Sequence, residues 1–252
     1  MNTQAWASAV NPDSFLSLVV PVYNEEARLM APVDSVIAFL EKNFRQWEII
    51  YSDDGSTDST ASLVRTLQQT YKAVRLVGSE KNRGKGSAVR LGRAAALGDL
   101  ILFSDADFSS PIEECLKLVS AIENGYDLAI GSRGLDDSQI EVRQPWLRES
   151  MGKTFNLILR TLLPIPFYDT QCGFKMFRRE AAKVILPRLQ VNRFAFDVEM
   201  LVIAQQHGLR IAEVPVVWRD VLESKVHPVK SSLQMLGDVF AIRYRLAMNL
   251  YA

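Results

Sequence analysis

The chain has 252 residues, 48% of them hydrophobic and 23% charged, which is an ordinary composition for a soluble globular protein. Its 29 basic and 29 acidic side chains give a formal net charge of +0, so no overall basic field favours binding to nucleic acid. The two cysteines, Cys115 and Cys172, are too few for a disulfide framework and lack the spacing of a zinc site, which favours a reducing cytosol.

The first half of the chain alternates between short apolar runs and segments of helical periodicity. Strands are predicted over residues 16–22, 47–52, 74–77, 100–104 and 128–131. Between them, a first helix opens at Pro32, a second is capped by Ser56 or Asp58, and a third covers 85–97. A fourth helix begins at a capping box formed by Ser110 and Glu113. This alternation is typical of an α/β protein.

The second half is less regular. It predicts a helix over 146–163, a short strand over 173–177, a helix over 196–207, a strand over 211–217 and a final helix over 231–250. We see no flexible linker, low-complexity segment or internal repeat. The sequence therefore predicts one domain built on a mostly parallel sheet with helices on both faces. In such a sheet, ligands bind at the carboxyl ends of the strands.

Two carboxylates, Asp105 and Asp107, directly follow the predicted strand over 100–104. Because side chains alternate along a strand, both point to the same side, where they repel each other unless a cation lies between them. Their oxygens are the hard ligands that Mg²⁺ or Mn²⁺ prefers when the metal also holds substrate phosphates. The alternative is a solvated loop that caps the helix beginning near Pro111.

Further polar side chains follow the other predicted strands. Asp53 and Asp54 end the second strand, where a carboxylate can accept hydrogen bonds from a ribose or a base; an ordinary capped turn is the alternative. The loop 81–86 (KNRGKG) opens a helix with Arg83 and Lys85, which suits an anion, while a solvated basic turn fits equally well. Acidic groups that converge on one sheet edge need a compensating cation or ligand, which favours the metal site.

Four segments occur in the order and spacing of a known family: 20–26 (VPVYNEE), 53–58 (DDGSTD), 82–86 (NRGKG) and 105–107 (DAD). Together they resemble the inverting glycosyltransferases of family 2, which have the Rossmann-like GT-A fold. Later segments at 131–133 (GSR), 169–175 (DTQCGFK), 196–199 (FDVE) and 224–226 (SKV) resemble the dolichyl-phosphate, or polyprenyl-phosphate, β-glucosyltransferase group. That group is related to the dolichyl-phosphate mannose synthases, and the resemblance covers nearly the whole chain.

The resemblance implies a role for each matching residue on the donor side. Pro21, Tyr23, Glu25 and either Asp53 or Asp54 would line the nucleoside pocket, with Arg83 and Lys85 near the diphosphate. Asp105 would face the ribose and the sugar, and Asp107 would bind the Mg²⁺ or Mn²⁺ that bridges the diphosphate. A divalent cation there would stabilise the leaving nucleoside diphosphate as a Lewis acid.

On the acceptor side, the resemblance implies a polyprenyl phosphate of the dolichyl type. A phosphate monoester is already ionised near neutral pH, so it needs cations and positioning more than a general base. Arg133 and Arg148 are suited to hold it through bidentate hydrogen bonds, with a surface salt bridge to Glu149 as the alternative for Arg148. Asp169 and Gln171 would lie beside the reacting sugar. For Asp169 we favour an orienting role over that of a base or a sugar ligand.

One acidic pair and one basic segment are each open to two interpretations. Asp197 and Glu199 lie at a helix start and either belong to the site or only cap the helix. Lys225, His227 and Lys230 form a basic segment that is either a lid over the diphosphate or a solvated loop. The candidate catalytic residues are therefore Asp105, Asp107, Arg133, Asp169 and Gln171.

The resulting hypothesis is metal-dependent transfer of glucose from UDP-glucose to a polyprenyl phosphate by one domain of residues 1–252. Residues 1–135 would bind the nucleotide sugar, and residues 136–252, with a C-terminal amphipathic helix, would bind the acceptor. Alternatives within the enzyme class are a GDP-mannose donor or a soluble hydroxyl acceptor. A non-catalytic nucleotide-sugar-binding module is disfavoured by the intact Asp105 and Asp107. A nucleotidyltransferase is disfavoured because Asn24, rather than a glycine-rich loop, follows the first strand.

Membrane contact is a further expectation. Residues 1–14 lack the pattern of a signal peptide, and no uninterrupted apolar stretch of roughly 18 residues is present to span a bilayer. Segments 146–166 and 231–252 combine apolar side chains with basic ones, as helices that lie in a membrane interface do. They either contact a membrane or pack on the catalytic domain. The expected location is the cytoplasm, with peripheral contact on the cytoplasmic face of the membrane.

Overall fold

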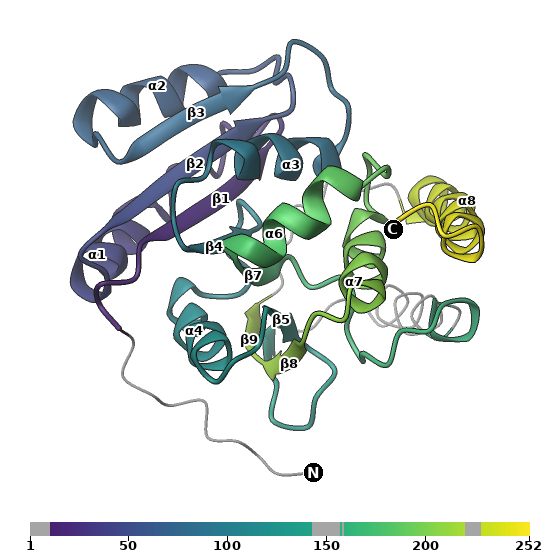
Figure 1. Cartoon of the computed structure of the whole chain (residues 1–252). Helices are drawn as coiled ribbons and strands as arrows, with labels where there is room; N and C mark the ends of the chain where they lie inside the picture. Colours follow the sequence, from purple (N-terminus) through teal and green to yellow (C-terminus); the bar gives the residue numbers. More distant parts are fainter. Residues whose placement is uncertain (1–10, 143–156, 158, 220–227) are drawn as a thin grey trace.

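The computed structural model describes residues 11–142, 157, 159–219 and 228–252 (Figure 1). Its centre is a seven-stranded sheet in the order β3-β2-β1-β4-β7-β5-β8. All neighbouring strands are parallel except β7, which runs antiparallel to both β4 and β5. The strands are β1 (Leu16–Val22), β2 (Trp47–Asp53), β3 (Val74–Gly78), β4 (Leu100–Ser104), β5 (Leu128–Ser132), β7 (Phe174–Arg178) and β8 (Ile211–Pro215). The mostly parallel sheet predicted from the sequence is therefore confirmed.

Helices cover both faces of this sheet, also as predicted. Helices α1, α2 and α4 pack on one face, in a core that includes Leu18 and Val20 of β1. Helices α3, α6, α7 and α8 contribute to the core on the other face, which includes Val19 and Phe103. The helices are α1 (Val33–Asn43), α2 (Thr60–Thr70), α3 (Lys85–Ala95), α4 (Cys115–Glu123), α6 (Arg179–Ile185), α7 (Phe196–Gln206) and α8 (Pro228–Ala247).

Hydrophobic spacing explains the best-predicted elements. In α1 the apolar residues Val33, Val36, Ile37 and Leu40 recur at helical spacing, and each is at most 3% exposed. Helix α7 differs because it is apolar all around and is buried from Phe196 to Ala204. A helix buried on all sides carries its polar residues for a reason other than solvation, which directs attention to the acidic side chains of its first turn.

Three local predictions were wrong. The N-cap of α2 is Ser59, and neither Ser56 nor Asp58 holds that position. Ser110 and Glu113 do not open a helix: Ile112–Glu114 form a 3-10 turn, and α4 begins at Cys115. Ser110 is instead buried, with its Oγ 4.0 Å from the sulfur of Cys172. The strand predicted over 211–217 is divided, because Pro215 ends β8 and lacks the N–H that a ladder needs. The chain then forms β9 (Val217–Arg219), which pairs with the unpredicted β6 (Gln139–Val142) in a separate two-stranded sheet.

The long amphipathic segments are described in part. Most of the helix predicted over 146–163 lies outside the described residues, while residues 159–162 are helical. The predicted C-terminal helix is α8, which begins slightly earlier and ends at Ala247. Within the described residues, no helix combines the length and apolar character needed to cross a bilayer.

Candidate active site

The predicted site residues gather at one edge of the main sheet. Strands β1, β2, β4 and β5 run in one direction, so the residues that follow each of them emerge at the same edge. Strand β7 runs the opposite way, and its first residue, Phe174, pairs with the last residue of β4, Ser104. The segment 169–173 that precedes β7 therefore joins the same edge. The chain thus brings residues from both of its halves to one place.

The centre of this edge is an ion pair between Lys85 and Asp105. Lys85 is the first residue of α3, and its Nζ lies 2.5 Å from Oδ1 of Asp105. The ammonium also lies 5.3 Å from the centre of the Phe103 ring. Burial lowers the pKa of Lys85, but the charges of Asp105 and Asp197 outweigh burial and raise it overall. Lys85 is therefore a permanent positive charge at neutral pH.

Gly173 leaves the space that the carboxylate of Asp105 occupies. The backbone N–H of Asp105 donates to the carbonyl oxygen of Gly173 at 3.0 Å. A Cβ on residue 173 would lie 2.1 Å from Oδ2 of Asp105, a distance that side chains do not tolerate. Glycine is therefore required for the observed position of Asp105.

Replacing Gly173 with alanine is expected to displace Asp105 and to lower catalytic activity by roughly a hundredfold, as misplacing a reacting group does. Overpacking should also lower the free energy of unfolding by about 1–3 kcal/mol. Initial rates and urea unfolding measure the two effects. Gly237→Ala is the control, because its Cβ would meet no described atom within 4 Å. Equal activity of the two variants would contradict the claim that Gly173 is needed to position Asp105.

Asp107 lies on the turn after β4 and is partly exposed. Its Oδ1 accepts hydrogen bonds from the backbone N–H and the hydroxyl of Ser109, at 3.0 and 2.9 Å. Within the described residues, no three His, Cys, Asp or Glu side chains cluster as a complete metal cage. Mg²⁺ and Mn²⁺ commonly use one or two carboxylates and complete their shell with water and substrate phosphates, so this donor set fits such an ion. Asp107 is the freer of the two carboxylates, since Asp105 is paired with Lys85.

The carboxylates of Asp53 and Asp54 both accept hydrogen bonds from backbone N–H groups of neighbouring loops. Asp53 accepts hydrogen bonds from the N–H and hydroxyl of Ser56, at 2.9 and 2.5 Å. The two oxygens of Asp54 accept the N–H groups of Arg83 and Gly84, at 2.9 and 2.7 Å. Asp54 therefore fixes the basic loop that leads into Lys85, while the Arg83 side chain is exposed. The structure places both aspartates beside this loop, and their predicted contact with a nucleoside stays a prediction.

The residues after β1 lie beside this turn. The backbone N–H of Glu25 donates to the hydroxyl of Thr60 at 2.7 Å, and the Glu25 carboxylate pairs with Arg28. Pro21 is half-buried near the end of β1, and Tyr23 is 39% exposed. The three residues predicted for the nucleoside pocket are thus close to the Asp53–Asp54 turn. Their contact with a nucleoside also remains a prediction.

Arg133 and Asp169 form a two-pronged ion pair. Arg133 donates from Nε to Oδ2 at 2.6 Å and from one terminal nitrogen to Oδ1 at 2.9 Å, and its backbone N–H donates to Oδ2 at 3.0 Å. The guanidinium also lies 5.4 Å from the centre of the Trp218 ring. Burial alone would raise the pKa of Asp169, but the charge and hydrogen bonds of Arg133 lower it to about 2. Asp169 is therefore ionised at neutral pH and is a weak base, and its orienting role stays a prediction.

The depressed pKa of Asp169 predicts a specific pH dependence of stability. A carboxyl whose pKa falls from 3.8 to about 2 on folding stabilises the protein above pH 4 and loses that contribution as the pH falls toward 2. The contribution is on the order of 2 kcal/mol. Urea unfolding should show that the difference in the free energy of unfolding between the wild type and Asp169→Asn becomes smaller as the pH falls from 6 to 3. A constant difference in the free energy of unfolding over that range would contradict the lowered pKa of Asp169.

The remaining predicted residues are Gln171, Arg148 and the basic segment that contains Lys225. Gln171 lies in the same loop, where its backbone N–H donates to Asp169 at 3.2 Å and its side-chain nitrogen lies 4.0 Å from the sulfur of Met235 on α8. Arg148, Lys225 and His227 lie outside the described residues, as does the side chain of Lys230. Their predicted roles therefore stay predictions.

The sequence did not predict one buried pair, and it left Glu199 open between a role in the site and a helix cap. Lys175 is 0% exposed, and its Nζ lies 2.5 Å from Oδ1 of Asp197. Glu199 is also 0% exposed, and it accepts hydrogen bonds from the N–H groups of Gln190 and Val191 and from the hydroxyl of Tyr251. Neither acid serves as the N-cap, a position held by Ala195. The available signal was two acids in an otherwise apolar helical run.

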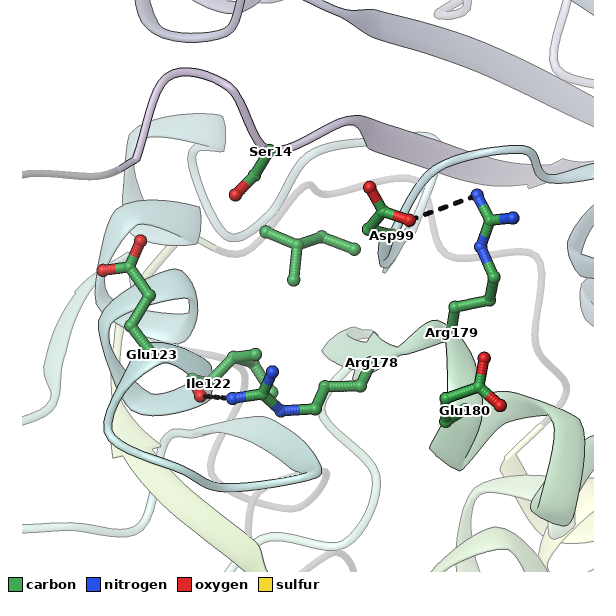
Figure 2. A pocket seen from close by; sticks show the side chains of 8 residues that line it. Ser14, Asp99, Ile122, Glu123, Arg178, Arg179 and Glu180 are labelled. Carbon is green, nitrogen blue, oxygen red and sulfur yellow. Dashed lines mark hydrogen bonds and ion pairs between the residues drawn. The ribbon is translucent and has the colours of Figure 1, made fainter.

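A separate hollow of about 280 Å³ lies at the opposite edge of the sheet (Figure 2). Its lining includes Asp99 and Leu100 at the start of β4 and Arg178 and Arg179 at the end of β7. Arg179 pairs there with Asp99 at 3.5 Å, and Arg178 donates to the carbonyl of Tyr126 at 2.9 Å. The carboxylate cluster lies at the other end of the same strands, so this hollow is distinct from the candidate active site.

Comparison with known proteins agrees with this geometry. Residues 17–186 match the model of the family described as glycosyl transferase family 2. The chain belongs to this family. The match covers the strand ends that carry Asp53, Asp105, Arg133 and Asp169, so the candidate site falls inside the family region. The protein is therefore a glycosyltransferase.

Curated relatives of this family 2 enzyme share one name. It is 38% identical over 249 residues to the dolichyl-phosphate beta-glucosyltransferase of Dictyostelium discoideum, covering 94% of this chain and 76% of that protein. It is 38% identical over 248 residues to the enzyme of the same name from Homo sapiens, covering 93% and 76%. The resemblance found in the sequence motifs is thus confirmed over most of the chain.

Solved structures confirm the fold. Glucosyl-3-phosphoglycerate synthase from Mycobacterium tuberculosis, in complex with Mn²⁺, UDP and glucosyl-3-phosphoglycerate, superposes with a TM-score of 0.65 at 22% identity, covering 92% of this chain and 80% of that one. Mannosyl-3-phosphoglycerate synthase from Rubrobacter xylanophilus gives 0.67 at 18% identity, covering 95% and 76%. At these identities the similarity concerns the fold alone, and the predicted GT-A fold is confirmed.

Proposed function

We propose that this glycosyltransferase moves glucose from UDP-glucose to a polyprenyl phosphate of the dolichyl type, with Mg²⁺ or Mn²⁺ as cofactor. The names of its relatives support the sugar and the acceptor. The Arg133–Asp169 pair is the observation that carries the proposal, because it combines a cation suited to a phosphate with a carboxylate unsuited to act as a base. A hydroxyl acceptor would need such a base, and a phosphate acceptor does not.

On the donor side, the bond between glucose and the diphosphate breaks as negative charge grows on UDP. Asp107 would hold the divalent cation, and the cation would neutralise part of that charge. Lys85, and Arg83 from the loop held by Asp54, would supply further positive charge near the diphosphate. Asp105 would orient the sugar or ribose. Pro21, Tyr23, Glu25, Asp53 and Asp54 would form the nucleoside side of the site.

On the acceptor side, Arg133 would bind the lipid phosphate and aim one of its oxygens at the anomeric carbon. Asp169 would hold the guanidinium plane, since both of its oxygens are bonded to Arg133. Gln171 would lie beside the reacting sugar, and Arg148 would be a second phosphate ligand. Attack opposite the departing UDP inverts the anomeric centre, in keeping with the inverting family that the motifs resemble.

A donor and acceptor panel tests the proposal. Radiolabelled UDP-glucose, UDP-galactose, UDP-GlcNAc and GDP-mannose are each incubated with Mg²⁺ or Mn²⁺, with and without polyprenyl phosphate. We expect label in the organic extract only with UDP-glucose and the lipid phosphate. Label from GDP-mannose would reassign the donor. Comparable transfer to a soluble hydroxyl acceptor would overturn the assigned acceptor.

We also propose that residues 1–252 act as one domain. Residues 1–135 would bind the donor, and residues 136–252 would bind the acceptor. The strand order of the sheet supports a single unit, since β5 of the first half lies between β7 and β8 of the second.

The acceptor is a lipid, and we propose peripheral contact between α8 and the cytoplasmic face of a membrane. One side of α8 packs into the core through Val239 and Ile242, which are 0% exposed. The other side presents Phe240 and Tyr244, 59% and 62% exposed, and just beyond the helix Met248 is 57% exposed. Such an apolar stripe suits the interface of a bilayer. Met235 of the same helix has its sulfur 4.0 Å from the side-chain nitrogen of Gln171, which supports a position of α8 near the proposed acceptor.

Replacing Phe240 and Tyr244 with serine is expected to lower binding to anionic liposomes by roughly a hundredfold or more, because burying each large apolar side chain contributes about 1.5–3 kcal/mol. Liposome flotation measures the bound fraction. Leu97→Ser, at a 56% exposed position following α3, is the matched control. Unchanged flotation of the α8 variant would contradict the membrane contact while leaving the assigned reaction intact.

A further inference from the structure

Lys175 is a fully buried lysine in the middle of the sheet. It belongs to β7, where it pairs with Phe103 of β4 and Ile130 of β5, and it is 0% exposed. A buried ammonium is costly unless it is paired and hydrogen-bonded. Asp197, at the start of α7, supplies the pair at 2.5 Å and is itself only 4% exposed. The edge-to-face contact between Phe103 and Phe196, with ring centres 5.8 Å apart, packs beside this pair.

The same ammonium also holds the loop that seats Asp105. Nζ of Lys175 donates to the carbonyl oxygen of Cys172 at 2.5 Å. Cys172 directly precedes Gly173, whose carbonyl accepts the N–H of Asp105 and on which a Cβ would lie 2.1 Å from the Asp105 carboxylate. A continuous set of contacts therefore runs from Asp197 through Lys175 and the 172–173 peptide to Asp105.

We propose that Lys175 and Asp197 are a positioning pair that fixes the 169–173 loop and, through Gly173, the carboxylate of Asp105. The inference rests on the proposed function of Asp105 in sugar transfer. Neither side chain touches substrate in this assignment. The pair sets the geometry of a group that does, so its loss lowers the rate of transfer more than the affinity for the donor.

A purely structural role makes a different prediction. Buried ion pairs can often be replaced by apolar side chains of similar volume without loss of stability, whereas removing one partner is strongly destabilising. The surroundings of this pair are apolar, since residues Val198–Ala204 of α7 and the neighbouring Phe103 are largely hydrophobic and buried. An apolar replacement can therefore restore the core while leaving the Cys172 carbonyl without its donor.

The test is the double variant Lys175→Met with Asp197→Leu, assayed for UDP-glucose transfer to polyprenyl phosphate and for thermal unfolding. We expect a thermal midpoint close to that of the wild type, an unchanged KM for UDP-glucose and a kcat reduced by roughly 10- to 100-fold. A kcat equal to that of the wild type overturns the proposal. The matched control is Lys183→Met with Glu180→Gln, which removes an exposed lysine–carboxylate pair of 2.7 Å on α6.

Two single variants serve if the double variant does not fold. Asp197→Asn keeps an oxygen where Lys175 binds but leaves the ammonium without its counter-charge, so the thermal midpoint should fall while kcat of the folded enzyme stays within about threefold of the wild type. Asp197→Glu keeps the charge but lengthens the side chain, so it should displace Lys175 and lower kcat by roughly tenfold. The reverse order would indicate a need for charge rather than position and would overturn the proposal.

The wild type in the same assay separates this inference from the proposed function. A wild type that does not use polyprenyl phosphate contradicts the assigned acceptor. The variants are then compared by the release of UDP from UDP-glucose in water. The same expected ratios of kcat support the positioning pair in that assay, and equal rates overturn it.

Discussion

Replacing Asp107 with asparagine is expected to lower kcat/KM for sugar transfer by a factor of roughly 10² to 10³. The amide has no charge to hold a divalent cation, and the growing charge on the leaving diphosphate would then lack its main counter-charge. Local structure should survive, because the Oδ1 that accepts two bonds from Ser109 is retained as an amide oxygen. Initial rates over a range of Mg²⁺ and Mn²⁺ concentrations measure the effect, and the variant should need a higher metal concentration.

The matched control for Asp107 is Asp99→Asn. Asp99 is also an aspartate that adjoins β4, but it precedes the strand at the opposite edge of the sheet and its side chain is 71% exposed. We expect activity close to that of the wild type. Chelation of the metal should lower wild-type activity to a level near that of Asp107→Asn. Full activity of the Asp107 variant, or of the chelated wild type, would remove Asp107 as a metal ligand.

Replacing Arg133 with methionine is expected to lower kcat/KM for the lipid phosphate by a factor of roughly 10² to 10³, because truncating one partner of a buried charge pair costs about 2–5 kcal/mol. Binding of UDP should change little, since Arg133 follows β5 and the proposed diphosphate ligands follow β3 and β4. Arg133→Lys should recover only part of the activity, because an ammonium keeps the charge but loses the bidentate fork. Titration of the acceptor, with UDP binding measured separately, distinguishes these effects.

Stability must be separated from recognition in the Arg133 experiment. Arg133→Met leaves the buried carboxylate of Asp169 without its partner, which alone is destabilising. Adding Asp169→Asn removes that unpaired charge and should recover much of the free energy of unfolding, without recovering acceptor affinity. Arg179→Met, at an arginine–aspartate pair on the far edge, is the control. Recovery of acceptor use by the double variant would show that Arg133 acts only through stability.

Much of the fold follows from local pattern. The short apolar runs at residues 16–22, 47–52 and 100–104 correspond to buried strands, and the spacing of Val33, Val36, Ile37 and Leu40 matches the buried face of α1. The antiparallel direction of β7 could not be read in the same way. Residues 174–178 are typical of any buried strand, and their direction depends on pairing with β4 and β5, which are far away in sequence. Local propensity carries no information about such pairings.

The candidate site was predictable to a similar extent. Carboxylates placed directly after parallel strands must meet at one edge, so the gathering of Asp53, Asp105 and their neighbours follows from the fold class. The specific partners do not follow. Lys85 and Asp105, Arg133 and Asp169, and Lys175 and Asp197 come from different elements, and their pairing depends on how those elements pack. The capping box failed for a related reason, because burial of Ser110 against Cys172 outweighed a purely local signal.

The antiparallel strand β7 also affects how the chain can fold during synthesis. Strands β1 to β4 emerge first and can pair with one another, but β5 cannot take its place until β7 lies beside β4. The nascent chain therefore carries an open edge on β4 from the synthesis of residues 100–104 until residues 174–178 have emerged, a state in which unpaired strands invite aggregation. Arg133, the proposed acceptor ligand, reaches the edge that carries Asp105 only when this late pairing is complete. We therefore expect a fragment ending near residue 135 to lack a formed active site, and fusion or truncation designs should keep β4, β5 and β7 together.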